Sequence, residues 1–174
     1  TRRIYSNVGF DVVADLVAER AGMPFPAYLH EAVLAPLGMA DSVLEGSAAA
    51  GLVATVDDLA LVARELLAPT LVAPDTRALA TGVAFPGLAG VLPGIGAADP
   101  LDWGLGVEVK GDKHPHWSGD ATSPRTFGHF GAAGSFLWVD PVRTVGCVGL
   151  SGREFGPWAM RAWPALADAV VAVA

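Results

Sequence analysis

Residues 128–150 read GHFGAAGSFLWVDPVRTVGCVGL, and this stretch decides the fold class. Its segments 133–139 and 143–150 are rich in β-branched and aromatic side chains, which favour strands. The Asp140-Pro141 pair between them is typical of a tight turn, so the two segments are expected to form an antiparallel hairpin. Residues 103–109 predict a third strand. The glycine-rich residues 128–134 are expected to bend and lead into the hairpin.

Helical periodicity dominates the first half of the chain. In residues 8–21, apolar residues recur three and four positions apart with acidic residues between them. This pattern predicts a helix, which Gly22 and Pro24 would end. Thr55, followed three residues later by Asp58, has the pattern of a capping box. The expected helices cover residues 8–21, about 26–35, 55–69, a short segment from 74, and about 157–172 at the C-terminal end.

Two connections separate these elements. Residues 82–100 are rich in glycine and proline and have no periodicity, which predicts a long loop. Residues 111–125 are expected to form an exposed connection. Helices segregated from antiparallel strands indicate an α+β fold. Residues 1–100 would be a mostly helical region with a long loop, and residues 101–174 the strands with a final helix.

The composition limits the classes of function. With 52% hydrophobic and 17% charged residues, the 174-residue chain has the composition of a globular domain. Its net charge of −7 argues against nucleic acid or an anionic membrane surface as a partner. Asp168 interrupts the apolar C-terminal segment, so no membrane span is expected. The single Cys147 is expected to be a core thiol on a strand, and no cofactor is expected.

Tyr5-Ser6-Asn7, just before the first helix, is one of two stretches with side chains suited to chemistry. A tyrosine oxygen acts as a base only if nearby cations bring its pKa well below about 10, and Arg2 and Arg3 are close in sequence. Asn7 can donate and accept hydrogen bonds at once. Taken alone, the simpler interpretation is a packed Tyr5 and a helix-capping Asn7.

His129 opens the second stretch. Its imidazole can hold or donate a proton near neutral pH. Gly131 and Gly134 allow a ligand to approach the backbone, whose N–H groups can stabilise an oxyanion. Taken alone, this stretch is more simply interpreted as a glycine-rich bend with a half-buried histidine.

Together, and in this order, the two stretches resemble the class C β-lactamase and esterase family of serine hydrolases. Members of that family carry a Ser-x-x-Lys motif, then Tyr-x-Asn, then Lys-x-Gly or His-x-Gly on a strand; a related set in class A enzymes uses Ser-Asp-Asn and Lys-Thr-Gly. The resemblance extends over nearly the whole chain. It includes the segments 36–39 (PLGM), 51–59 (GLVATVDDL), 103–106 (WGLG) and 136–141 (FLWVDP).

The resemblance implies a β-lactamase/transpeptidase-like fold and roles for five residues. Tyr5 matches the tyrosine that acts in general acid/base catalysis, and Asn7 the asparagine that binds substrate and steadies the lysine of Ser-x-x-Lys. His129 and Gly131 match the first and third positions of the strand motif. Ala132 matches the residue whose backbone N–H forms half of the oxyanion hole. The implied substrate is a small-molecule ester or amide.

The chain departs from the family pattern at the nucleophile. Neither Lys110 nor Lys113 has a serine three positions before it, so the chain contains no Ser-x-x-Lys. We therefore expect residues 1–174 to be the C-terminal part of one β-lactamase-like domain, whose N-terminal segment supplies the serine. Without that segment the chain is expected to be inactive and prone to self-association.

Two further departures bear on the substrate. His129 stands where class C β-lactamases resemble one another in having lysine, and Phe130 replaces a small or hydroxyl residue. Both changes favour an esterase or acyl-transferring enzyme, with a β-lactamase, D-Ala-D-Ala carboxypeptidase or D-aminopeptidase as the alternative. Gly152 also replaces an asparagine common in the closing strand.

Three other interpretations of the sequence remain open. Thr1 has the chemistry of an N-terminal nucleophile whose own amine serves as base. Two histidines and two aspartates that share a short segment have the chemistry of a zinc site. The chain is also compatible with a non-catalytic binding module on a decayed hydrolase fold. The residues considered for zinc are His114, His116, Asp112 and Asp120.

Overall fold

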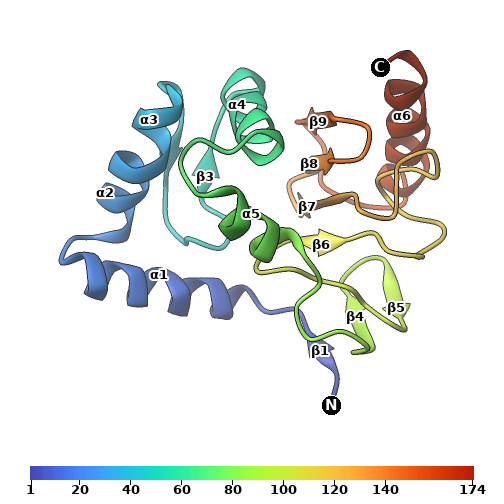
Figure 1. Cartoon of the computed structure of the whole chain (residues 1–174), viewed down its shortest axis with the longest axis horizontal. Helices are drawn as coiled ribbons and strands as arrows, with labels where there is room; N and C mark the ends of the chain where they lie inside the picture. The colour runs from blue at the N-terminus through green and yellow to red at the C-terminus, as the bar shows by residue number, and fades with distance from the viewer.

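A four-stranded antiparallel sheet forms the centre of the protein in the computed structural model, which describes residues 1–174 (Figure 1). The strand order is β6-β7-β8-β9, so each strand pairs with its neighbour in sequence. The helix α4 (Val56–Leu67) lies against β8 and β9. The last helix, α6 (Ala159–Val173), contacts β9. The strands are β6 (Glu108–Val109), β7 (Phe127–Gly131), β8 (Ser135–Asp140) and β9 (Val145–Gly149).

Alternation along these strands builds two apolar cores, one on each face of the sheet. On β8, Trp138 joins the core beneath α6, where it packs with Trp163. The next residue, Val139, joins the core beneath α4, together with Phe127 and Ala63. The predicted hairpin at Asp140-Pro141 is confirmed, and the α+β fold class with it.

The helical region begins with α1 (Asn7–Ala21) and continues through α2 (Phe25–Leu29), the π-helical turn η1 (His30–Leu34) and α3 (Ala35–Leu37). The helix predicted to stop against Pro36 thus runs on to Leu37. The wider π turn accommodates Pro36, which has no N–H to donate, and Gly38 in the left-handed region then ends the helix.

The capping box before α4 is partly confirmed. Thr55 is its N-cap, and the Thr55 hydroxyl oxygen accepts a hydrogen bond from the Asp58 N–H at 3.2 Å. The Asp58 side chain does not return to Thr55. Its Oδ2 instead accepts from the Ser42 hydroxyl at 2.7 Å and from the Asp41 N–H at 3.0 Å. The short helix predicted from Pro74 is α5 (Pro74–Thr81).

The prediction of an irregular loop over residues 82–100 is wrong. Within it, β4 (Gly90–Leu92) and β5 (Gly96–Ala98) form a hairpin, and β1 (Arg3–Ile4) pairs with β4 in parallel. A second small ladder joins β2 (Val43–Leu44) to β3 (Leu52–Val53). These strands have two or three residues each, too few to produce a period in the sequence.

The strand region also differs from the prediction in three places. Of residues 103–109, only Glu108 and Val109 form a strand, because the two glycines of Trp-Gly-Leu-Gly place a turn there. Residues 128–131, which taken alone favour a bend and which the resemblance places in a strand motif, belong to the strand β7. The connection over 111–125 is not wholly exposed. Trp117 within it is only 1% exposed and packs in the core beneath α6.

The last helix confirms the C-terminal prediction, with Pro164 inside α6. Cys147 lies half-buried on β9 beside the core beneath α6, and burial raises the pKa of its thiol. None of the helices combines the length and the apolarity that crossing a bilayer requires.

Asp140 secures the β8–β9 turn, and its removal should be costly. Its carboxylate is fully buried and accepts the Ser123 N–H and hydroxyl at 2.6 Å each, as well as the Val142 N–H at 3.0 Å. Burial alone would raise the pKa of Asp140, but these hydrogen bonds outweigh it and leave the pKa below its ordinary 3.8. The stabilisation is therefore present above pH 3.8 and is lost as the pH falls through the lower folded-state pKa.

Asp140→Asn should lower the free energy of unfolding by about 2–3 kcal/mol. In either orientation of the new amide, its NH2 group would face a backbone N–H that the carboxylate accepts. Urea denaturation of the complete protein at pH 7 measures this. Asp112→Asn, at an exposed carboxylate in the connection 111–125, is the control and should leave the midpoint unchanged. Equal midpoints for both variants would contradict the role given to Asp140.

Candidate active site

Three aromatic rings from distant parts of the chain meet at the end of the central sheet. The Tyr5 ring lies 5.7 Å from the His129 ring and 5.9 Å from the Trp103 ring, between centroids. Trp103 and His129 meet edge to face at 5.4 Å. Tyr5 and His129, both predicted as site residues, are thus brought into one cluster.

The pairing of β1 with β4 places Tyr5 there. Arg3, on β1, donates from Nε to the Leu101 carbonyl at 2.9 Å and from a terminal nitrogen to the Ala84 carbonyl at 2.7 Å. Tyr5 then packs against the core of Leu92, Leu101 and Trp103. Arg3 is therefore a structural clamp for this strand, and its guanidinium is held by backbone carbonyls.

Within these 174 residues, no arginine lowers the pKa of Tyr5. Partial burial raises the pKa of the phenol above 10.0, and no charged group opposes this. A base at this position needs a cation that these residues do not place beside it.

Asn7 is the first residue of α1 and is exposed. Ser6 occupies the N-cap position, and neither side chain caps the helix by a hydrogen bond. The interpretation of Asn7 as a helix cap is therefore wrong. Its side chain is available to a ligand or to another segment, next in the chain to the Tyr5 cluster.

His129 is held in one tautomer by its neighbour. Nδ1 lies 2.6 Å from the Phe130 carbonyl oxygen, which can only accept, so Nδ1 carries the proton and Nε2 is the acceptor in the neutral ring. Burial lowers the pKa of His129, although the Phe130 carbonyl and the Glu108 carboxylate oppose that effect. The imidazole is therefore neutral at pH 7.

Phe130 faces away from His129 because neighbouring residues on a strand point to opposite faces. Its ring stacks on Phe155 at 4.6 Å and packs against Trp117 and Trp163. Phe130 thus packs in the core beneath α6 and also against the core of Leu92, Leu101 and Trp103, where Tyr5 lies, so the expectation that it adds apolar surface beside the reacting bond stays a prediction.

Gly131 to Gly134 form the turn between β7 and β8, here called the 131–134 turn. The Gly134 N–H donates to the Gly131 carbonyl at 3.0 Å, and the Phe155 N–H donates to the Ala132 carbonyl at 2.8 Å. Ala132 is exposed at the tip. The turn follows His129 after one residue, so His129 and Gly131, the two matched positions of the strand motif, lie close together at the end of β7.

A cavity of about 280 Å³ opens beside Tyr5. Its walls are mostly apolar and come from β1, the start of α1 and the segment around Trp103. The indole N–H of Trp103 is buried and has no hydrogen-bond partner. An unpaired buried donor is costly, so this side of the site lacks an acceptor.

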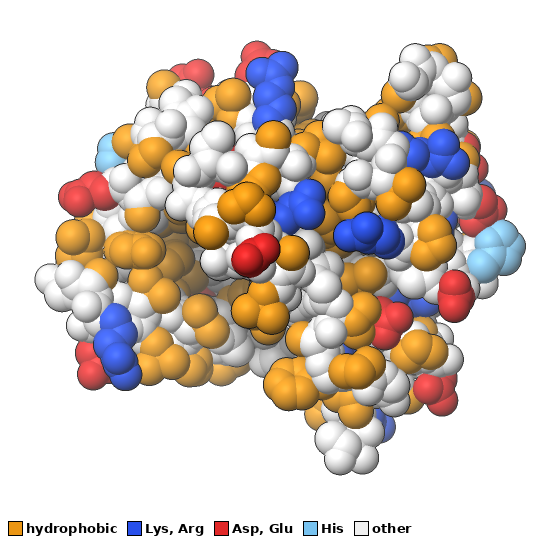
Figure 2. All heavy atoms as spheres, in the orientation of Figure 1, with side chains coloured by type: hydrophobic (Ala, Val, Ile, Leu, Met, Phe, Trp, Pro, Cys, Tyr) orange, Lys and Arg blue, Asp and Glu red, His pale blue; other side chains and the backbone are white.

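The outer side of α1 carries an apolar stripe, defined as Val8, Val12 and Leu16. These side chains recur every four residues and are 68%, 51% and 52% exposed. Ile4 on β1 is 71% exposed near the start of the same helix. Figure 2 shows hydrophobic side chains gathered along this edge. Exposed apolar surface of this kind marks a site of contact with a ligand, a membrane or another protein segment.

A separate buried ionic cluster surrounds Glu108. Its carboxylate accepts the Trp117 indole N–H at 2.6 Å and lies 3.4 Å from both Lys113 Nζ and His116 Nε2. Burial would raise the pKa of Glu108, but these neighbours outweigh it and lower the pKa. Burial lowers the pKa of His116 despite the nearby Glu108 carboxylate.

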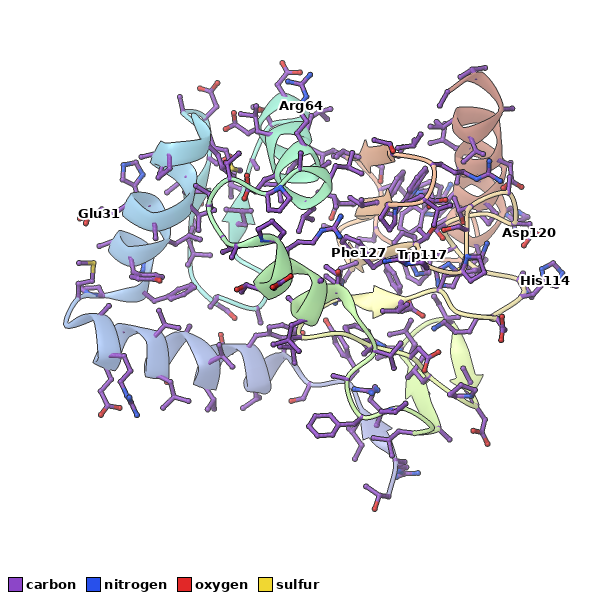
Figure 3. All side chains as sticks on the ribbon, in the orientation of Figure 1. Glu31, Arg64, His114, Trp117, Asp120 and Phe127 are labelled. Atoms are coloured by element: carbon purple, nitrogen blue, oxygen red, sulfur yellow. The ribbon has the colours of Figure 1, made fainter.

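This arrangement separates the residues considered for zinc. His114 points outward, where it pairs with Asp120 at 2.8 Å, whereas His116 turns inward to Glu108. In Figure 3, His114 and Asp120 lie at the rim and Trp117 lies inside. The structure shows no group of three or more metal-binding side chains.

Residues 1–172 match the family model described as beta-lactamase. The chain belongs to the beta-lactamase family. This confirms the resemblance and, with the architecture above, the β-lactamase/transpeptidase-like fold. A search of curated protein sequences found no significant match.

Several solved structures resemble the chain in fold. A beta-lactamase from Mycobacterium bovis shares 52% identity with a TM-score of 0.96, and the match covers 99% of this chain and 65% of that one. EstCE1, a hydrolase with promiscuous acyltransferase activity, shares 18% identity with a TM-score of 0.74, covering 97% and 56%. Simvastatin synthase from Aspergillus terreus shares 16% with a TM-score of 0.74, covering 94% and 54%. The chain thus spans between about half and two thirds of these relatives.

Proposed function

We propose that the complete protein is a serine hydrolase that acts through an acyl-serine intermediate, as an esterase or acyl-transferring enzyme. The observation that carries this proposal is the cluster in which the rings of Tyr5, His129 and Trp103 all contact one another at the end of the sheet. The nucleophile would come from a segment outside these 174 residues, since they contain no Ser-x-x-Lys.

Tyr5 would take the proton of the serine hydroxyl as it attacks the acyl carbon, then return it to the leaving group. This requires a cation near the phenol, because burial alone raises the pKa of Tyr5. The lysine of Ser-x-x-Lys would supply that charge. The cavity beside Tyr5 and the apolar stripe of α1 support this, because both offer surface for a further helix.

The developing oxyanion would bind two backbone N–H groups, that of Ala132 and that of the serine itself. Asn7, exposed at the start of α1, would orient a polar group of the substrate and the lysine. His129 and Gly131, both on β7, would line the site.

The neutral state of His129 favours uncharged substrates. A β-lactam or a D-Ala-D-Ala peptide carries a carboxylate that a permanent cation binds well. Burial lowers the pKa of His129, so no such cation is present there at pH 7. Arg125 does not replace it, because it lies exposed in the turn before β7 and does not act on the pKa of His129.

The expected result is a higher kcat/KM for p-nitrophenyl butyrate than for nitrocefin in the complete enzyme. His129→Lys should raise kcat/KM for nitrocefin by about tenfold, the value of one charge-assisted contact. Arg125→Lys, at an exposed position on the same segment, is the control and should change neither substrate. Nitrocefin as the better substrate of the unmodified enzyme would contradict the argument from His129.

A β-lactamase is the second candidate. It is favoured by the 52% identity to the Mycobacterium bovis protein, which is described as a beta-lactamase. The same pair of substrates separates the two candidates, because only a β-lactamase would prefer nitrocefin.

A further inference from the structure

The orientation of the Ala132 N–H depends on the peptide that links Gly131 to Ala132. In a trans peptide the carbonyl and the N–H point in opposite directions. The Gly134 N–H holds the Gly131 carbonyl at 3.0 Å, and it thereby fixes where the Ala132 N–H points. Whatever holds Gly134 therefore aims the donor at the tip of the turn.

Gly134 is held by the segment that follows β9. Its φ of 79° lies in the left-handed region, and it is buried so tightly that a Cβ would meet the Arg153 backbone and the Ser151 hydroxyl. Ser151 Oγ lies 2.9 Å from the Gly134 carbonyl and 2.8 Å from the Arg153 carbonyl. The Ser151 hydroxyl thus lies between two carbonyls, that of Gly134 in the turn and that of Arg153 in its own segment.

The same segment makes a second contact with the turn. The Phe155 N–H donates to the Ala132 carbonyl at 2.8 Å, and the Phe155 ring stacks on Phe130 of β7. Gly94 at the tip of the β4–β5 hairpin lies close to the same ring, because a Cβ there would meet Phe155 Cε1. The segment 151–155 is therefore anchored in the core on one side and bonded to the turn on the other.

We propose that Ser151 is a positioning residue that aims the Ala132 N–H at the oxyanion through Gly134 and Gly131. This inference rests on the proposed function, because it takes Ala132 as an oxyanion donor. Ser151 touches no substrate. It acts by restricting the turn, so its loss should affect the transition state and leave ground-state binding intact.

Ser151→Ala in the complete enzyme tests this. We expect kcat for p-nitrophenyl butyrate to fall by about tenfold or more, less than the hundredfold or greater loss typical of removing an oxyanion donor outright. KM should stay within about twofold, since ground-state binding is unchanged. The rate of labelling by a fluorophosphonate, whose phosphoryl oxygen occupies the oxyanion position, should fall in parallel.

Arg153→Ala is the matched control. It keeps the backbone carbonyl that Ser151 approaches and removes only an exposed side chain that lies over Trp158 at 5.4 Å. Its kcat and labelling rate should be unchanged. Ser151→Cys, which retains a weaker donor of similar size, should give an intermediate kcat and decides the question if Ser151→Ala fails to fold.

An unchanged kcat in Ser151→Ala, or a loss confined to KM, would overturn the inference. So would an equal loss in Arg153→Ala, because the effect would then come from disturbing the segment as a whole. Failure of the unmodified enzyme to hydrolyse the ester or to take the label would instead overturn the proposed function.

Discussion

The isolated 174-residue chain is expected to hydrolyse p-nitrophenyl acetate no faster than a protein without a nucleophile, and to remain unlabelled by a fluorophosphonate. It contains no Ser-x-x-Lys, and partial burial raises the pKa of Tyr5. Removing the nucleophile from a serine hydrolase costs on the order of 10⁶-fold in kcat. No other effect expected for this protein is as large.

Intact mass before and after treatment with the probe measures this directly. The complete protein is the positive control and should gain one probe per chain. Stoichiometric labelling of the isolated chain would contradict the argument. The labelled residue would then identify the alternative, and Thr1 would indicate an N-terminal nucleophile.

Tyr5→Phe in the complete enzyme is expected to lower the acylation rate by about 100-fold or more, within the range for general acid/base groups. The substitution removes only the phenolic oxygen. The ring contacts with Trp103 and His129 remain, so substrate binding and the unfolding midpoint should change little. Single-turnover kinetics with p-nitrophenyl butyrate separates acylation from later steps.

The chain contains a natural control for this experiment. Its only other tyrosine, Tyr28, is exposed on α2, and Tyr28→Phe should leave acylation unchanged. An unaffected acylation rate in Tyr5→Phe would return Tyr5 to a packing role in the Leu92–Leu101–Trp103 core.

Long elements with a clear period could be predicted from the sequence, and short ones could not. The stripe of α1 and the apolar hairpin β8–β9 each cover enough residues to show their spacing. The hairpin β4–β5 consists of glycine, alanine and a few apolar residues, and its pairing with β1 depends on a partner far away in sequence. The burial of Trp117 also depended on tertiary contacts, because its surroundings in sequence are polar.

The candidate site was predictable where a motif exists. Tyr5 and His129 were found through their order in the chain, and the structure brings them together. Trp103 stands in a segment that resembles the family, but nothing in the sequence marks it as a site residue. Ser151 gives no signal in the sequence, because its hydroxyl contacts backbone carbonyls, one of them in a turn that lies 17 residues earlier. The packing of Phe130 against two cores at once could not be predicted, because its partners come from segments far away in the sequence.

The pairing of β1 with β4 also determines when the site can form during folding. The strands β7, β8 and β9 are joined by short turns, whereas Arg3 reaches the Leu101 carbonyl across 98 residues. Closing that much longer loop costs about 3 kcal/mol more chain entropy than closing a turn of four residues. The central meander can therefore form early and Tyr5 arrives late. Since β1 has only two residues, it can open locally in the native state, so amide exchange at this strand reports how often the site is assembled.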